Sequence, residues 1–154
     1  MPPHAIITGG AGFIGSHLAG HLLGEGADVT LIDDLSTGRE ANVAGLLGAR
    51  CRRIRGRVSE VLAGEPGLLA GAGQVYHLAA TVGVGRVIAR PVETIRNNLE
   101  ETGVLVDAAA DAGCPVMLAS TSEVYGRSER LPLKESEELV YGPTTVSRWS
   151  YGMS

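Results

Sequence analysis

The stretch Thr8-Gly-Gly-Ala-Gly-Phe-Ile-Gly15 decides how this chain folds. It follows a short apolar run, Ala5-Ile6-Ile7, and it opens a helical pattern whose apolar positions include Leu18, Leu22 and Leu23. A strand, a glycine-rich turn and a helix in this order form the first unit of a dinucleotide-binding fold.

Each glycine of the turn has its own expected task. Gly9 lets the chain leave the strand sharply, Gly12 leaves room for a pyrophosphate, and Gly15 lets the helix lie close to the strand. The positive end of the helix then faces the anion, with Phe13 and Ile14 in its first turn. The spacing Gly-x-x-Gly-x-x-Gly is weak evidence alone, because the chain contains 22 glycines.

An acidic pair follows the second apolar run, Ala27 to Ile32, about 20 residues after the glycine turn. A carboxylate at this position, Asp33, accepts hydrogen bonds from the adenosine ribose and repels a 2′-phosphate, which favours NAD over NADP. Asp34 is the second candidate, and either acid could instead cap a helix or a turn. The loop that follows is expected to surround the adenosine, with Ser36, Thr37 and Gly38.

Apolar runs and helical patterns alternate along the whole chain, which predicts an α/β fold of the Rossmann type: a doubly wound parallel sheet in the order 3-2-1-4-5. The five expected strands are residues 5–7, 27–32, 51–55, 74–78 and 115–119. Expected helices cover residues 39–47, 59–69 with an interruption at Pro66, and 91–112, and another begins at Thr144. Val92, Ile95, Leu99, Leu105, Val106 and Ala109 are expected on the core face of the longest helix.

Composition limits the alternatives. The 154 residues, 44% of them hydrophobic, suit one folded domain over 1–154, and the net charge of −4 argues against a nucleic-acid partner. Cys51 and Cys114 have no metal-ligand spacing, so we expect no metal site and two buried thiols. The first residues are too short and polar for a signal peptide, and no apolar run reaches membrane length, so we expect a cytoplasmic protein with no membrane partner.

Four further side chains are expected to converge near the ends of strands one, four and five: Thr121, Ser122, Glu123 and Tyr151. A hydroxyl and a phenol beside a nicotinamide can bind a substrate alcohol, but the phenol must have a much lower pKa than usual to take its proton. From the residues alone, each is as readily a turn residue or a core phenol.

Three segments resemble the extended short-chain dehydrogenase/reductase family, which includes nucleotide-sugar epimerases, decarboxylases and dehydratases. Residues 8–18 match the opening of that family nearly letter for letter, residues 120–126 are similar to its active-site strand end, and residues 142–151 are similar to its Tyr-x-x-x-Lys segment. The resemblance implies NAD as cofactor, a nucleotide sugar as substrate, and Thr121, Glu123 and Tyr151 as catalytic residues.

The resemblance also implies the binding residues. For the cofactor these are Gly9, Gly12, Phe13, Ile14, Gly15, Asp33, Asp34, Ser36, Thr37, Gly38, Val58, Leu78, Ala79, Ala80, Asn98 and Tyr151. For the substrate they are Gly83, Val84 and Ser122.

The chain departs from the family in four places. The partner lysine of Tyr151 would be residue 155, and only about half of a typical member is covered, without the C-terminal substrate-binding domain. We therefore expect the isolated chain to be inactive and to self-associate as a homodimer through its uncovered sheet edge. Arg57 stands where the family usually has an acid that meets the adenine, and Glu101 stands where it usually has glycine.

The string Thr121-Ser122-Glu123 helps to choose among the reactions of the family. Serine is a poor general acid where the family's 4,6-dehydratases have aspartate, which disfavours dehydration. Similar strings occur in UDP-glucuronate decarboxylases and in epimerase-like relatives. We favour a nucleotide-sugar 4-epimerase working through a 4-keto intermediate, with a decarboxylase as the alternative. A catalytically inactive NAD-binding module remains a third interpretation.

Overall fold

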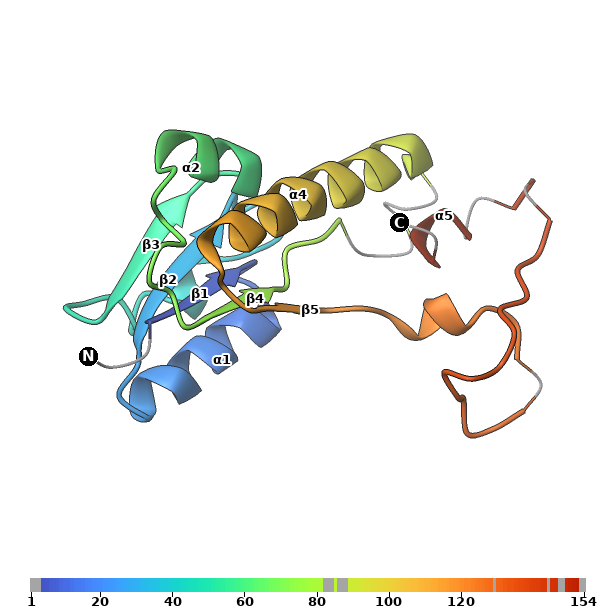
Figure 1. Cartoon of the computed structure of the whole chain (residues 1–154), viewed down its shortest axis with the longest axis horizontal. Helices are drawn as coiled ribbons and strands as arrows, with labels where there is room; N and C mark the ends of the chain where they lie inside the picture. The colour runs from blue at the N-terminus through green and yellow to red at the C-terminus, as the bar shows by residue number, and fades with distance from the viewer. Residues whose placement is uncertain are drawn as a thin grey trace. The chain divides into compact units, whose positions relative to one another are not determined.

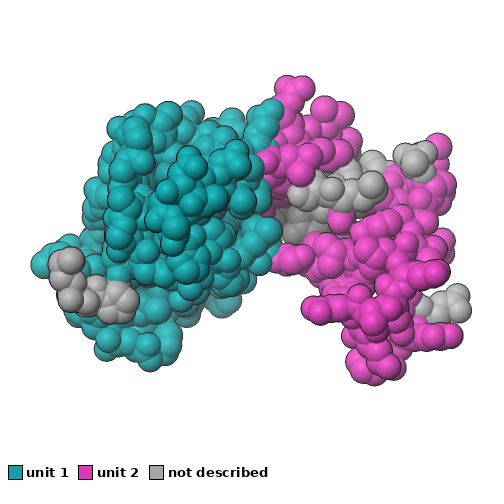
Figure 2. Space-filling model, viewed as in Figure 1, with its two compact units in different colours: residues 1–79, 100–119 teal, residues 80–99, 120–154 magenta. Residues whose placement is uncertain are grey.

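The computed structural model describes residues 4–81, 85, 89–128, 130–143, 145–146 and 149–152, without the side chains of Ser150 and Tyr151. Its contacts divide the chain into two compact units (Figure 2). Unit 1 contains residues 1–79 and 100–119, and unit 2 contains residues 80–99 and 120–154. The expectation of a single domain over residues 1–154 stays a prediction.

Unit 1 is built on a five-stranded parallel sheet in the order β3-β2-β1-β4-β5, as the sequence predicted (Figure 1). The strands are β1 His4–Thr8, β2 Asp28–Asp33, β3 Cys51–Arg55, β4 Gln74–His77 and β5 Val116–Leu118. The central strands β1 and β2 are almost wholly buried, because helices cover both faces of the sheet.

Alternate residues of the central strands serve two separate cores. Ile6 and Ile32 belong to the core shared with α2, Val58–Gly64, and with α4, Pro91–Ala112. Ile7 and Leu31 belong to the core on the side of α1, Phe13–Gly24. This alternation follows from the two-residue period of a strand.

The thiols of Cys51 and Cys114 are buried and unpaired, as expected from the sequence. Among the described residues, no helix combines the length and the apolar character needed to span a bilayer.

One prediction about a helix was wrong, and a second was confirmed in part. Residues 39–47 form only a 3-10 turn, η1, at Glu40–Asn42. The N–H of Arg39 and the side-chain amide of Asn42 both donate to the carbonyl of Ala11, at 3.0 and 2.8 Å, so the segment is tied to the glycine turn. The helix predicted over residues 59–69, with an interruption at Pro66, is present as far as Gly64, and the residues after Pro66 are not helical.

The core face of α4 also differs in part from the prediction. Leu105 and Ala109 are buried as expected, whereas Val92, Leu99 and Val106 are exposed. The polar Glu101 and Thr102 instead make contacts within unit 1. Apolar periodicity alone misplaced the face, because part of it consists of polar side chains whose partners lie elsewhere in the chain.

The described parts of unit 2 are mostly irregular. They include the first residues of α4, the 3-10 turn η2 at Ser122–Tyr125, and the short helix α5 at Trp149–Gly152. The Tyr141 hydroxyl donates to the carbonyl of Val124 at 3.1 Å and lies 3.5 Å from that of Gly152. Tyr141 therefore joins η2 to α5 within this unit.

Candidate active site

The glycine turn of unit 1 packs tightly on itself. A Cβ atom at Gly15 would collide with the carbonyl oxygen of Gly9 and lie 2.8 Å from the Cα atom of Gly10. Gly9 has φ +68°, and a Cβ atom there would lie 2.9 Å from the backbone nitrogen of Ala79. Two of the three glycines are thus required by contacts within the chain.

The third glycine, Gly12, faces a different demand. A Cβ atom there would come no nearer than 3.1 Å to another group, the carbonyl of Gly9. Gly12 is also the N-cap of α1, and a glycine has no side chain that could cap the helix. The N–H groups of the first turn of a helix have no partner inside the helix, so this end of α1 suits an anion.

Asp33 lies at the carboxyl end of β2 with only 7% of its surface exposed. One carboxylate oxygen accepts the N–H of Ala11 and the other accepts the N–H of Leu35, both at 2.8 Å. A Cβ atom on Gly38 would lie 2.7 Å from the carboxylate, so the loop passes directly over it. The carboxylate therefore holds the glycine turn and the following loop together.

Asp34 has the alternative role that the sequence left open for both acids. It is exposed, and its carboxylate accepts the N–H of Ser36 at 2.8 Å in a local turn. Thr37 is also exposed on this loop. Phe13 and Ile14 have 78% and 66% of their surfaces exposed in the first turn of α1.

A series of hydrogen-bonded, buried side chains lies next to the glycine turn, and the sequence did not predict it. The hydroxyl of Thr8 accepts the N–H of Ala79 at 3.2 Å and lies 2.7 Å from Nδ1 of His77. Nε2 of His77 lies 3.1 Å from the hydroxyl of Thr102 on α4. One consistent arrangement has Thr8 donating to Nδ1 and the Nε2–H donating to Thr102. These hydrogen bonds hold the backbone of Ala79 beside Gly9.

The imidazole of His77 is only 3% exposed. Burial lowers the pKa of His77, and the nearby Glu101 carboxylate opposes that effect only in part. We expect the folded chain to lose stability as the pH falls below about 6.5, because the unfolded chain then binds a proton that the folded chain excludes.

Between pH 7.5 and pH 5.5, the free energy of unfolding should therefore fall less in His77→Gln than in the natural chain. Urea unfolding at both pH values measures this difference. His21→Gln is the matched control, because His21 is on the exposed surface of α1. An equal loss for the natural chain and His77→Gln would contradict the role of His77.

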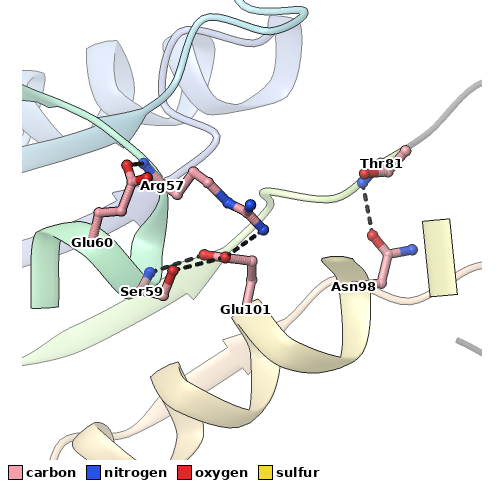
Figure 3. Close-up of polar contacts among 6 residues, drawn as sticks. All are labelled: Arg57, Ser59, Glu60, Thr81, Asn98 and Glu101. Atoms are coloured by element: carbon pink, nitrogen blue, oxygen red, sulfur yellow. Dashed lines mark hydrogen bonds and ion pairs between the residues drawn. The ribbon is translucent and has the colours of Figure 1, made fainter. Parts of the chain in front are cut away.

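Arg57, Ser59 and Glu101 meet at the start of α2 (Figure 3). The guanidinium of Arg57 lies 2.8 Å from the carboxylate of Glu101, which also accepts the N–H and the hydroxyl of Ser59 at 2.9 Å. Val58, expected among the cofactor-binding residues, is the first residue of α2 and is buried. The sequence signal for this cluster was two separate departures from the family, Arg57 and Glu101, which carry opposite charges.

Unit 2 contains the residues with expected catalytic roles. The hydroxyl of Thr121 accepts the N–H of Glu123 at 3.3 Å and so begins η2. Ser120, Thr121, Ser122, Val124, Tyr125, Glu135 and Leu139 line an open hollow of about 530 Å³. A Cβ atom on Gly152 would lie 3.0 Å from the carbonyl of Glu123, so α5, which includes the backbone of Tyr151, packs against η2.

The remaining predicted residues fall into three groups. Asn98 accepts the N–H of Thr81 at 2.8 Å within unit 2 and so supports the segment after Ala80 (Figure 3). Gly83 and Val84 lie outside the described residues, as does the side chain of Tyr151. Leu78 belongs with Gly9 in unit 1.

Residues 5–154 match the model of the NAD dependent epimerase/dehydratase family. The chain belongs to this family. Known relatives include the UDP-N-acetyl-alpha-D-glucosaminuronate decarboxylase of Bacillus cytotoxicus, 36% identical over 99% of this chain and 47% of the relative. The UDP-glucose 4-epimerase of Corynebacterium glutamicum is 35% identical over 92% of this chain and 43% of the relative.

Solved structures of epimerases share the fold. The UDP-glucose 4-epimerase of Brucella ovis in complex with NAD superimposes with a TM-score of 0.76 at 30% identity, over 98% of this chain and 44% of the other. This member of the epimerase/dehydratase family thus spans about half the length of the relatives that it matches.

Proposed function

We propose that unit 1 binds NAD and that the protein is an NAD-dependent nucleotide-sugar epimerase. The single observation that carries the cofactor part is Asp33, whose buried carboxylate holds the glycine turn at the end of β2. An acid at this point suits the two ribose hydroxyls, while the start of α1 suits the pyrophosphate. Bound NAD supplies the chemistry of accepting and returning a hydride.

The residues of unit 2 support the substrate part. Glu135 is the charged residue among the described residues that line the hollow beside Thr121 and Ser122, and no cationic residue is among them. A substrate carboxylate there would meet a like charge, so a neutral sugar fits better than a uronate. This favours a 4-epimerase, an isomerase, in which Thr121 and Tyr151 would bind the C4 hydroxyl and Tyr151 would take its proton.

A decarboxylase acting on a nucleotide-linked uronate is the second candidate. It is favoured by Thr121-Ser122-Glu123 and by the likeness to the Bacillus cytotoxicus decarboxylase. In that reaction Glu123 would assist the loss of carbon dioxide from the 4-keto sugar. A catalytically inactive NAD-binding module, the interpretation from another class, would bind NAD alone.

Calorimetry with NAD tests the cofactor proposal, and product analysis tests whether this chain turns over a sugar nucleotide. The chain is titrated with NAD by calorimetry and then incubated with NAD and UDP-glucose, UDP-galactose or UDP-glucuronate, with the products followed by chromatography. We expect saturable NAD binding and, for this 154-residue chain alone, no turnover. Formation of UDP-galactose from UDP-glucose, lost in Tyr151→Phe, would show that the chain is an active epimerase. It would contradict the expectation that the isolated chain is inactive. A UDP-pentose formed from UDP-glucuronate would instead favour the decarboxylase, and absence of NAD binding would refute the cofactor proposal.

We also propose a second copy of this chain as a partner and the cytoplasm as its location. The first is supported by apolar side chains that are 40–51% exposed on α4 and β5, namely Val104, Val106, Met117 and Leu118.

A further inference from the structure

The hydroxyl of Thr8 connects His77 to the glycine turn of unit 1. It accepts the N–H of Ala79 at 3.2 Å, and it lies 2.7 Å from Nδ1 of His77. Among the described residues these are its two hydrogen bonds, so Nδ1 is the acceptor for its single proton. The proton of the neutral ring is then on Nε2, which lies 3.1 Å from the hydroxyl of Thr102. Every group of this series has a partner while the imidazole is neutral.

A second proton on the ring disturbs the series at Thr8. Nδ1 of His77 then donates instead of accepting, so the Thr8 hydroxyl meets two donors and its own proton loses its acceptor. Thr8 is fully buried and His77 is only 3% exposed, so water does not replace the lost bond. A buried hydroxyl without an acceptor is unfavourable. The conflict is relieved when the backbone of Ala79 moves away from Thr8.

The backbone of Ala79 cannot move without affecting Gly9. A Cβ atom on Gly9 would lie 2.9 Å from the backbone nitrogen of Ala79, so the two segments pack closely. The N–H of Leu78 also donates to the carbonyl of Thr8, at 3.2 Å. Gly9 opens the turn whose N–H groups suit a pyrophosphate. The turn geometry that an anion needs is therefore favoured by the neutral form of His77.

We propose that His77 is a positioning residue that makes the affinity for NAD depend on pH: the neutral imidazole holds the turn in the geometry that receives the pyrophosphate, and protonation of the ring weakens binding. This inference rests on the proposed binding of NAD to unit 1. Because linkage is reciprocal, bound NAD favours the neutral ring, so binding to a partly protonated chain releases protons. His77 acts through Thr8 and Ala79 and needs no contact with the cofactor.

Glu101 on α4 is the charged group that acts on His77 among the described residues. Burial lowers the pKa of His77, and the carboxylate of Glu101, which is paired with Arg57 at 2.8 Å (Figure 3), raises it in part. The neighbours of His77 on the flanking strands, Thr8 and Leu118, carry no charge. Protonation in the folded chain therefore begins below the ordinary value of about 6.5, and Glu101→Gln should move it to a still lower pH.

Calorimetry with NAD at pH 7.5 and pH 5.0 tests the inference. We expect the dissociation constant of the natural chain to be about fivefold higher at pH 5.0, the lower end of the usual coupling between two linked sites. His77→Gln should change by less than about twofold, because an amide keeps an acceptor for Thr8 and a donor for Thr102 and takes up no proton. His21→Gln is the matched control and should behave like the natural chain, because His21 is on the exposed surface of α1.

A second measurement counts the protons that are released when NAD binds at pH 6.0. The binding heats in two buffers with different enthalpies of ionisation give this number. We expect the natural chain to release protons, Glu101→Gln to release fewer, and His77→Gln to release none. A purely structural role of His77 would not produce this order.

Equal changes of affinity with pH in the natural chain and His77→Gln would overturn the role of His77 while leaving NAD binding intact. Equal proton release in these two chains, or tighter binding of NAD by the natural chain at pH 5.0, would overturn it as well. If NAD does not saturate the natural chain at pH 7.5, the proposed cofactor function fails, and this inference fails with it.

Discussion

Gly15→Ala is expected to leave the chain about 2 kcal/mol less stable than Gly20→Ala and to remove measurable NAD binding. The added Cβ atom would overlap the carbonyl of Gly9 and crowd the Cα atom of Gly10. Both neighbours are backbone atoms of the turn, so relief requires the turn itself to move, and overpacking of this kind costs about 1–3 kcal/mol. A displaced turn no longer presents its N–H groups to a pyrophosphate.

Gly20→Ala in the same helix is the matched control. A Cβ atom at Gly20 meets only the end of the Leu46 side chain, at 3.7 Å, which is an ordinary contact. Both substitutions gain about 1 kcal/mol of helix propensity, so their difference isolates the steric cost at the turn. Free energies of unfolding in urea and NAD calorimetry measure the two effects. Equal stabilities for the two variants would show that the close packing around Gly15 does not exist in solution.

Asp33→Ala is expected to lower NAD affinity by at least tenfold and to narrow the preference for NAD over NADP. The substitution removes the acceptor for the N–H groups of Ala11 and Leu35. A buried N–H group left without a partner costs about 1–3 kcal/mol, so a loss of stability should accompany the loss of binding. The carboxylate is also the charge that would repel a 2′-phosphate.

Asp33→Asn and Asp34→Ala divide these effects. Asparagine keeps one acceptor oxygen and loses the charge, so NADP binding should improve relative to NAD at a smaller cost in stability. Asp34 is exposed and accepts the N–H of Ser36 in a local turn, so its loss should change the free energy of unfolding by no more than about 0.5 kcal/mol. Equal affinities of the natural chain for NAD and NADP would refute the assignment of Asp33. Equal losses of NAD affinity in Asp34→Ala and Asp33→Ala would refute it as well.

The sequence by itself determined the parallel sheet, its strand order and the glycine turn. These depend on short-range patterns: apolar runs of strand length, glycines at fixed spacing, and an acid at the end of the second run. Such patterns did not predict that residues 39–47 form only a 3-10 turn instead of the expected helix. This turn depends on the carbonyl of Ala11, about 30 residues away, which takes the hydrogen bonds of Arg39 and Asn42.

The tertiary structure decided the partners of the buried polar groups. Thr8, His77 and Thr102 are far apart in the sequence and carry no shared pattern, yet three parts of the fold bring them into hydrogen-bond range. Arg57 and Glu101 are two unrelated departures in the sequence and one ion pair in the structure. A polar side chain is satisfied by whichever group the fold places beside it, and local sequence does not encode that distance.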